Sequence, residues 1–369
     1  MITRLSISNY RSLGPDVDLR LGPLTALVGQ NGSGKTNIVD ALRFLGDCMR
    51  LGLDGAITKR HGIGAVRRWS SGHPYNLSVR LELGNTAFYG FTLAGAHAQE
   101  YRVKSEEARV VIDGEGHGFR LEENRWADGP SDLRPKVAPM NLALPLVGGD
   151  ERFSPLAEAL RSMAVYSIFP DILREPQKYD PSKPMKEHGS NWVSILKDHG
   201  DNSWRDDLLA ALGQLTGDIE DLEIRPTGGY LIARFKHTST EKRAKWFEAA
   251  QESDGTLRVA GILTALLQSS ALSVVGLEEP ELTVHPGALP LLFDFIKEAS
   301  DRRQVILTTH SPDLLDRLTV DEIRIVERRD GKTVVAPLDP HQREAVRDHL
   351  LTLGDILRTK GLKQLSLPT

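Results

Sequence analysis

The segment Gly29–Thr36 constrains the fold of this chain more than any other part of the 369-residue sequence. It reads Gly-Gln-Asn-Gly-Ser-Gly-Lys-Thr and fits the phosphate-loop pattern G-x-x-x-x-G-K-[ST] at every position. An apolar run, Leu24–Val28, precedes it, and apolar residues at helical spacing follow from Ile38 to Leu45. Because a strand before and a helix after are the context of a phosphate-binding loop, we favour that interpretation over an ordinary turn. The segment therefore predicts a nucleoside triphosphate site.

The chemistry of a phosphate site explains the residue types in this loop. Glycines at positions 29, 32 and 34 allow positive φ angles and a close approach of the backbone to a phosphate. The loop amides and the helix N-terminus then offer partial positive charge to the anion. Lys35 adds a full charge on a flexible side chain, and the Thr36 hydroxyl is placed to bind Mg²⁺.

Composition restricts the class of protein. Charged residues make up 26% and hydrophobic residues 40% of the chain, as in an ordinary soluble globular protein. The formal net charge of −4 gives no global attraction to nucleic acid. Cys48 is the single cysteine, so no internal disulfide can form, which suits a reducing cytoplasm. No segment approaches ~18 consecutive apolar residues, so we expect a cytoplasmic protein with no membrane partner.

Hydrophobic periodicity divides the chain into β-rich and helical parts. Alternating apolar residues in 76–126, with turn signals at Gly84-Asn85 and Asp113-Gly114, predict an antiparallel sheet. The helix after the phosphate loop is expected to end near Met49, and the proline-rich stretch 130–145 is expected to be loop. The remaining expected elements are strands within 2–9 and 16–21, helices at 153–163, 192–197 and 204–215, and hairpins at 222–236 and around Asp330-Gly331.

These elements predict an α/β fold with a mixed-sheet core, an antiparallel β lobe and a helical insert. We expect a nucleotide-binding head over residues 1–335 and a helical C-terminal tail over 336–369. Within the head, the expected parts are a core formed by 1–50 and 251–335, a β-rich lobe at 51–135, and a loop and helical insert at 136–250.

A basic cluster lies between Thr58 and Trp69. Its members are Lys59, Arg60, His61, Arg67 and Arg68. Such a cluster is more often a solvated surface loop than a phosphate-contacting patch, and the sequence leaves both open. If the second holds, a weak and salt-dependent DNA contact is expected there.

A second constellation follows the apolar run Ser273–Leu277, which ends at the adjacent carboxylates Glu278 and Glu279. A buried strand that stops at two carboxylates predicts that one holds the Mg²⁺ shell while its neighbour orients and deprotonates the attacking water. Acidic residues after a strand are common, and the signal becomes strong only because a full phosphate loop precedes it.

Two segments flank these carboxylates. Ser253-Asp254-Gly255 opens a helical pattern, where it fits either helix capping or contact with a γ-phosphate supplied by another subunit. Downstream, the strand pattern Gln304–Thr308 ends near His310, at the place where a γ-phosphate sensor belongs in a parallel nucleotide-binding sheet.

Taken in order, four motifs resemble those of the ABC-type ATPases of the RecF/SMC/OLD branch, and most of all the short bacterial AAA-family ATPases that occur as stand-alone heads. The motifs are G-x-N-G-S-G-K-T-N from Gly29, S-D-G-T from Ser253, E-E-P-E-x-x-x-H-P from Glu278, and T-H-S-P from Thr309. Individually weaker matches at Ile7–Ser12, Leu173–Pro176 and Gly189–Asn191 extend the resemblance over most of the chain.

This resemblance implies a P-loop NTPase fold of ABC-ATPase type with ATP and Mg²⁺ as cofactors. It makes Gly29–Thr36 the Walker A motif, Ser253–Gly255 the signature, Glu278 and Glu279 Walker B, Glu281–His285 the D-loop, and His310 the switch histidine. The implied catalytic residues are Glu279, His310 and Lys35, and the implied metal ligands are Thr36 and Glu278. The implied nucleotide-binding residues are Gly29, Asn31, Gly32, Ser33, Gly34, Lys35, Thr36, Asn37, Ser253, Asp254 and Gly255.

The same resemblance implies a homodimer that sandwiches ATP, with hydrolysis opening the pair. It places such a switch in DNA maintenance or in defence against phage and other foreign DNA, with a separate nuclease-like effector. Glu-Glu at Walker B and Thr256 after the signature depart from transporter-type relatives. The pattern does not place the Q-loop glutamine, and Gln177 is a candidate for it. SMC-type arms and a TOPRIM nuclease domain are not expected, because heptads are lacking and few residues follow His310. The alternatives are a transporter ATPase subunit and an ATP-binding scaffold with negligible turnover.

Overall fold

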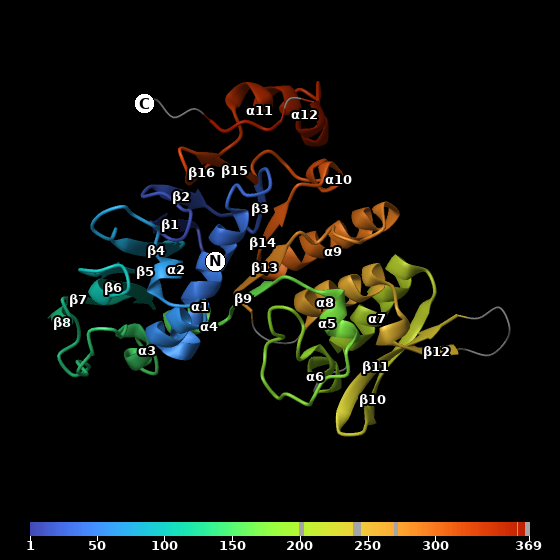
Figure 1. The fold of residues 1–369 in the computed structure, drawn as a ribbon, viewed down its shortest axis with the longest axis horizontal. Helices are drawn as coiled ribbons and strands as arrows, with labels where there is room; N and C mark the ends of the chain where they lie inside the picture. Colours follow the sequence, from blue (N-terminus) through green and yellow to red (C-terminus); the bar gives the residue numbers. More distant parts are fainter. Residues whose placement is uncertain (199–202, 239–244, 269–271, 360, 366–369) are drawn as a thin grey trace. The chain divides into compact units, whose positions relative to one another are not determined.

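The computed structural model describes residues 1–198, 203–238, 245–268, 272–359 and 361–365. It divides into two compact units, which we describe separately (Figure 1). Unit 1 comprises Met1–Met163, Val320–Leu351 and Lys360–Thr369, and unit 2 comprises Ala164–Thr319 and Thr352–Thr359. The domain boundaries expected from the sequence stay predictions.

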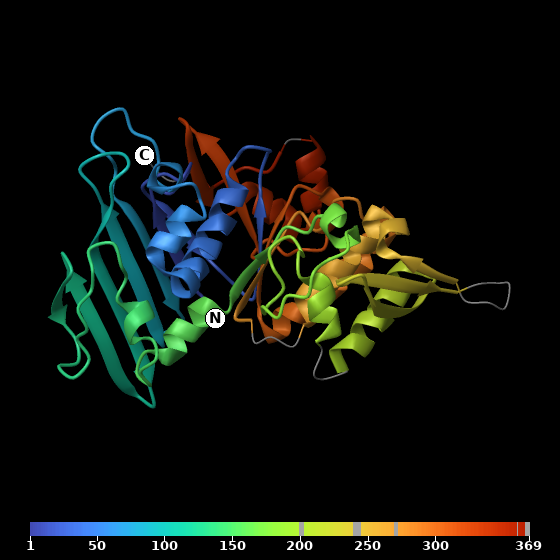
Figure 2. The ribbon, with the colours of Figure 1, turned by 60° about the horizontal axis from the view of Figure 1, so that its bottom comes forward.

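A seven-stranded antiparallel sheet dominates unit 1, in the order β2-β1-β4-β5-β6-β7-β8. Its inner face carries the alternating apolar residues of the sequence, such as Leu77, Val79 and Leu81, all buried. Helix α1 (Lys35–Thr58) lies along that face (Figure 2), and its Phe44 ring lies 6.3 Å from the ring of Phe91. The antiparallel sheet predicted for 76–126 is therefore confirmed. The strands are β1 (Arg4–Ser8), β2 (Val17–Arg20), β4 (Leu77–Leu83), β5 (Ala87–Ala94), β6 (Arg102–Ile112), β7 (Glu115–Glu122) and β8 (Arg125–Asp128).

The second β element of unit 1 contains the strand that leads into the phosphate loop. Strand β3 (Leu24–Val28), buried at every residue, pairs in parallel with β15 (Ile323–Arg329). Strand β15 turns at Asp330-Gly331 into β16 (Lys332–Ala336), as the turn signal predicted. The short helices of unit 1 are α2 (Ile63–Val66), α3 (Leu144–Val147), α4 (Ser154–Arg161) and α11 (Pro340–Arg347).

Helix α1 is longer than the sequence indicated. The expected end near Met49 is wrong, because the helix runs to Thr58 across a kink at Gly52, whose φ is 73°. Leu53, Ala56 and Ile57 are buried beyond the kink, so packing restores the helix after the glycine. The helix predicted at 153–163 is shorter than expected: α4 ends at Arg161, and Met163 begins strand β9 (Met163–Tyr166).

Unit 2 is built around the parallel pair β13 (Val274–Glu278) and β14 (Gln304–Thr309), with β9 beside β13. Gly276 allows the close approach of β9, because a Cβ there would lie 2.8 Å from a methyl group of Val165. Helices α8 (Asp254–Leu267) and α9 (Leu289–Arg302) pack against these strands and against each other. The predicted hairpin turns at Gly228-Gly229 and is confirmed. It forms a three-stranded sheet from β10 (Ile219–Thr227), β11 (Tyr230–His237) and β12 (Lys245–Glu248).

The other helices of unit 2 are one longer helix, α7 (Ser203–Thr216), and several short ones. Those predicted at 192–197 and 204–215 are confirmed as α6 (Trp192–Lys197) and α7. The remainder are α5 (Pro170–Arg174), α10 (Pro312–Leu315), α12 (Leu353–Thr359) and the 3₁₀ turns Ala249–Gln251 and Pro286–Ala288. The predicted helical tail thus contributes α11 and α12, while 360 and 366–369 lie outside the described residues. None of the helices in the described ranges is long and apolar enough to cross a membrane.

Candidate nucleotide-binding site

The phosphate loop lies between β3 and α1, as its sequence context predicted. Gly32 and Gly34 have φ angles of 79° and 104°, which only glycine adopts readily. Lys35, the first residue of α1, donates from Nζ to the carbonyl oxygens of Gly29 at 2.8 Å and Gln30 at 3.2 Å. The lysine therefore spans the loop from helix to strand.

The loop also offers features that suit an anion. Gly34 is the N-cap of α1 and has no side chain to accept from the first-turn amides. Ser33 is 5% exposed, and its Oγ has no hydrogen-bond partner in the described part of the chain. Asn31 and Thr36 are exposed, with Thr36 in the first turn of the helix. A buried hydroxyl without a partner and a helix start without a cap are what a bound phosphate would satisfy.

Asn37 has a different environment from the rest of the loop. Its Nδ2 donates to the hydroxyl of Ser12 at 2.6 Å, in the N-terminal segment of unit 1. The side chain is thus held by protein, and its assignment to nucleotide binding stays a prediction.

In unit 2, the carboxyl ends of β13 and β14 bring the Walker B glutamate and the histidine together. Glu279 adopts a φ of 44°, and its amide donates to Thr308 O at 3.0 Å and Thr308 Oγ1 at 3.2 Å. Its Oε1 lies 3.4 Å from Nδ1 of His310. A left-handed glutamate at a strand end is a strained conformation that the surrounding bonds maintain. Two of the three side chains that the resemblance made catalytic, Glu279 and His310, are therefore neighbours.

Two further residues hold this arrangement: Glu281, the first residue of the implied D-loop, and Arg258, which the sequence did not single out. Glu281 accepts at Oε1 from Thr309 Oγ1 at 2.7 Å and from the His310 amide at 3.3 Å. Arg258, buried on α8, donates from Nη2 to Glu279 O at 2.9 Å. Burial lowers the pKa of Arg258, although Glu281 and Glu279 oppose the shift. Glu281 could be noticed in the sequence as the third glutamate of E-E-P-E, whereas no sequence pattern marked Arg258.

The signature segment caps α8 in unit 2. The Ser253 hydroxyl accepts from the Thr256 amide at 3.1 Å, so capping, one of the two interpretations left open, is observed. Asp254 forms an ion pair with Arg174 of the L-R-E-P segment. The signature and the 283–288 segment line a hollow of about 830 Å³, together with His237.

His237 is held between two carboxylates of unit 2. Its Nδ1 lies 2.8 Å from Asp218 Oδ2, and its Nε2 lies 2.8 Å from Glu252 Oε1. Burial alone would lower the pKa of His237, but the hydrogen bonds to Asp218 and Glu252 raise it. Because Glu252 precedes Ser253, this charged group supports the start of the signature.

The basic cluster does not form an exposed phosphate-contacting patch, and that interpretation is wrong for its buried members. Arg60 has a side chain 4% exposed and pairs with Asp40 at 3.0 Å and Asp47 at 2.9 Å. Arg67 is buried and donates to Glu100 O at 3.1 Å, and Lys59 pairs with Asp47 at 3.2 Å. Asp40 and Asp47 are buried on α1 and require these cations as partners.

The Q-loop candidate is also held by its own unit. Gln177 donates from Nε2 to the carbonyl oxygens of Ile172 and Gly189, both at 3.0 Å. Its Oε1 accepts from the Val193 amide at 3.3 Å. Gln177 therefore ties three backbone segments together in this conformation.

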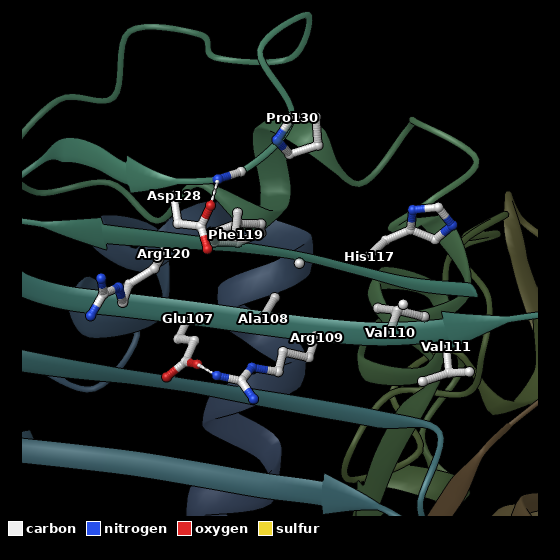
Figure 3. A pocket seen from close by; sticks show the side chains of 13 residues that line it. Glu107, Ala108, Arg109, Val110, Val111, His117, Phe119, Arg120, Asp128 and Pro130 are labelled. Carbon is white, nitrogen blue, oxygen red and sulfur yellow. Dashed lines mark hydrogen bonds and ion pairs between the residues drawn. The ribbon is translucent and has the colours of Figure 1, made fainter. Parts of the chain in front are cut away.

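A larger hollow, of about 900 Å³, lies on the β6–β8 part of the sheet in unit 1 (Figure 3). Gly116 and Gly118 form part of its floor, and Glu107 pairs with Arg109 at 3.0 Å on its side. Mixed charges on a regular sheet face, without a glycine-rich turn or a helix start, do not suit a triphosphate. Across the described ranges, no group of three or more His, Cys, Asp or Glu side chains is placed to hold a metal ion.

Comparison with known proteins identifies the family. Residues 77–316 match the model described as "AAA domain, putative AbiEii toxin, Type IV TA system", and residues 1–51, which include the phosphate loop, match an AAA ATPase domain. An OLD nuclease of Thermus scotoductus is 24% identical over 367 residues, covering 94% of this chain and 66% of that protein. The chain thus spans slightly less than two thirds of this relative.

Solved structures agree on the fold. An SMC head bound to the C-terminal winged-helix domain of ScpA matches with a TM-score of 0.56 at 18% identity, covering 92% of this chain and 99% of that one. An SMC head with an extended coiled coil, bound to the C-terminal domain of ScpA from Pyrococcus furiosus, matches with a TM-score of 0.52 at 14% identity, covering 95% and 99%. The P-loop fold of ABC-ATPase type is confirmed. The chain is similar to an OLD nuclease in sequence and to SMC heads in fold, and it belongs to the AAA-domain family of the matched description.

Proposed function

We propose that the protein is a Mg²⁺-dependent ATPase that works as a nucleotide-driven switch. The observation that carries the proposal is the pairing of Glu279 with His310, 3.4 Å apart at the ends of two parallel strands, in a chain that also contains a complete phosphate loop. Carboxylates and polar side chains at the carboxyl ends of parallel strands form the reactive edge of nucleotide-binding sheets.

We assign a distinct task to each group of residues. Lys35 and the amides of the phosphate loop bind the β- and γ-phosphates, and Thr36 and Glu278 hold Mg²⁺, which neutralises developing charge when bound. Glu279 accepts a proton from the attacking water and orients it. His310 is close enough to fix the Glu279 carboxylate, and its proposed second task is to sense the γ-phosphate. Glu281 positions His310 through Thr309 and the His310 amide.

The switch requires a second copy of the chain. Ser253, Asp254 and Gly255 of one subunit contact the ATP held by the Walker A loop of its partner, so that two ATP molecules join two heads. The start of α8 supports this proposal, because a helix N-terminus attracts phosphate. Ser253 caps its own helix and yet remains exposed.

The biological setting follows from the relatives. One is named an OLD nuclease, and we propose that this chain acts in DNA maintenance or in defence against foreign DNA. Nuclease chemistry would come from a separate effector whose access to DNA the ATP-bound state controls. The basic cluster contributes no more than a weak DNA contact, through its exposed members alone.

Concentration dependence tests the dimer. ATPase activity per subunit should rise with protein concentration, and Ser253→Arg should bind ATP but fail to dimerise. In mixtures, Lys35→Ala and Ser253→Arg subunits should recover activity, because one composite site remains intact. A specific activity that is independent of concentration contradicts the sandwich. Release of phosphate by the wild-type protein also distinguishes an ATPase from an ATP-binding scaffold with negligible turnover. Co-purification with a membrane protein would favour the transporter alternative.

A further inference from the structure

We propose that Thr333, distant in sequence from every nucleotide motif, is a positioning residue of the phosphate loop. With Ser12 and Asn37 it fixes one peptide plane of the loop in the orientation needed for phosphate. The inference rests on the proposed function, because the orientation matters only if the loop binds a nucleotide.

Thr333 contacts the loop directly. It is fully buried on β16, and its Oγ1 donates to Ser33 O at 2.7 Å. A Cβ at Gly34 would lie 2.1 Å from the same oxygen, so only glycine permits this contact. The hydroxyl of Thr333 therefore supports the Ser33–Gly34 peptide from the side opposite to its N–H.

That peptide plane decides where a loop amide points. In a trans peptide the C=O and the following N–H point in opposite directions. Because the Ser33 carbonyl is held toward Thr333, the Gly34 N–H is turned the other way. On the proposed function, that is the side that receives phosphate.

A chain of hydrogen bonds extends the support to the first turn of α1. Ser12 Oγ and Thr333 Oγ1 lie 2.7 Å apart, and Asn37 Nδ2 donates to Ser12 Oγ at 2.6 Å. A hydroxyl has one hydrogen, and Thr333 donates its hydrogen to Ser33 O. Ser12 must then donate to Thr333 and accept from Asn37. The chain runs in one direction, from Asn37 through Ser12 and Thr333 to Ser33, and such chains strengthen their members.

The backbone keeps Thr333 in place. Its amide donates to Ser12 O at 2.8 Å, and Gly14 donates to Thr333 O at 3.3 Å. The N-terminal segment is itself anchored on α1, because Arg11 pairs with Asp40 at 3.0 Å. Arg11 adopts a φ of 48°, a conformation that a non-glycine residue keeps only under such constraint. The segment Asn9–Ser12 and the β15–β16 hairpin thus meet at the phosphate loop.

The test compares three variants by titration with a fluorescent ATP analogue in Mg²⁺, alongside urea unfolding of each protein. Thr333→Val keeps the shape and removes the hydroxyl, and its Kd should rise about three- to tenfold, as for the loss of one buried hydrogen bond. Thr333→Ser keeps the hydroxyl and should bind like wild type. Thr92→Val removes a hydroxyl that pairs with Ser78 at 3.0 Å elsewhere in unit 1, and should also bind like wild type.

The outcomes separate the alternatives. Equal affinities for Thr333→Val and Thr333→Ser would overturn the positioning role. If Thr333→Val does not fold, Ser12→Ala decides the matter, since it removes both the donor to Thr333 and the acceptor for Asn37 and so interrupts the chain. A raised Kd supports the inference and an unchanged Kd overturns it. A wild-type protein that binds the analogue no better than Lys35→Ala would instead contradict the proposed function.

Discussion

The phosphate loop and the carboxylate edge, which consists of Glu279, Glu281 and His310 in unit 2, both hold reactive groups in place. They do so through different kinds of contact. The loop in unit 1 is held by neutral hydroxyls and by backbone contacts from distant segments, with Thr333 separated from Ser33 by 300 positions. The carboxylate edge in unit 2 is held by charged side chains, with Glu281 and His310 from the same stretch of chain and Arg258 from helix α8. The loop therefore depends on contacts between segments far apart in the chain, whereas the edge depends on charged side chains around two neighbouring strand ends.

The largest expected effect is on binding and concerns the loop. Lys35→Ala removes the positive charge that the proposed function assigns to the β- and γ-phosphates. It also removes the bonds that join the helix start to Gly29 and Gln30. We expect ATP binding to be abolished, as measured by equilibrium titration. Circular dichroism is the control for folding, and a folded Lys35→Ala protein with wild-type affinity would contradict the site.

The matching change in unit 2 should separate binding from chemistry. Glu279→Gln keeps the shape of the side chain and removes the base, so ATP should bind normally while hydrolysis slows by ~10²–10⁴-fold. The rate is measured as phosphate release over time. The comparison is Glu281→Gln, which changes a carboxylate that contacts Thr309 Oγ1 and the His310 amide. If Glu279→Gln turns over at the wild-type rate, the base has been assigned to the wrong residue.

This contrast explains what could be predicted from the sequence. Gly29–Thr36, Glu278-Glu279 and His310 are local patterns between a strand and a helix or turn, so their secondary-structure context could be read directly. Thr333 and Arg258 could not be found, because their roles depend on contacts between segments far apart in the chain. The basic cluster misled for the same reason: Arg60 and Arg67 look like surface residues until Asp40, Asp47 and the sheet are seen to enclose them.

The buried ion pairs of unit 1 allow a test of folding stability. They have no direct role in nucleotide binding. Arg60→Met leaves Asp40 and Asp47 buried with fewer partners, and breaking a buried pair costs about 3–5 kcal/mol. Because Arg11, Arg43, Arg50 and Lys59 also contact these carboxylates, we expect the lower end of that range in urea unfolding. The control is Arg68→Met, whose guanidinium lies 5.3 Å from the Tyr75 ring and should matter far less. Equal stability of the two variants would show that the ion-pair network does not hold α1.

The smallest expected effect is on the pH dependence of folding stability, and it concerns His237 of unit 2. The fold raises the pKa of His237 through Asp218 and Glu252, so the folded state binds a proton more tightly than the unfolded chain does. Its contribution to stability is therefore complete below the unfolded pKa, near ~6.5, and is lost as the pH rises through the higher folded value.

Thermal unfolding of wild type and Glu252→Gln at pH 6 and pH 8 measures this difference. Wild type should lose more stability between the two pH values, because the variant has already lost the negative charge that holds the imidazolium. The hydroxyl chain from Asn37 to Ser33 contains no titratable group, so nucleotide affinity of the Thr333→Val and wild-type proteins should keep a constant ratio over the same interval. A pH-dependent ratio would show that a titratable group outside this chain of hydrogen bonds acts on the phosphate loop.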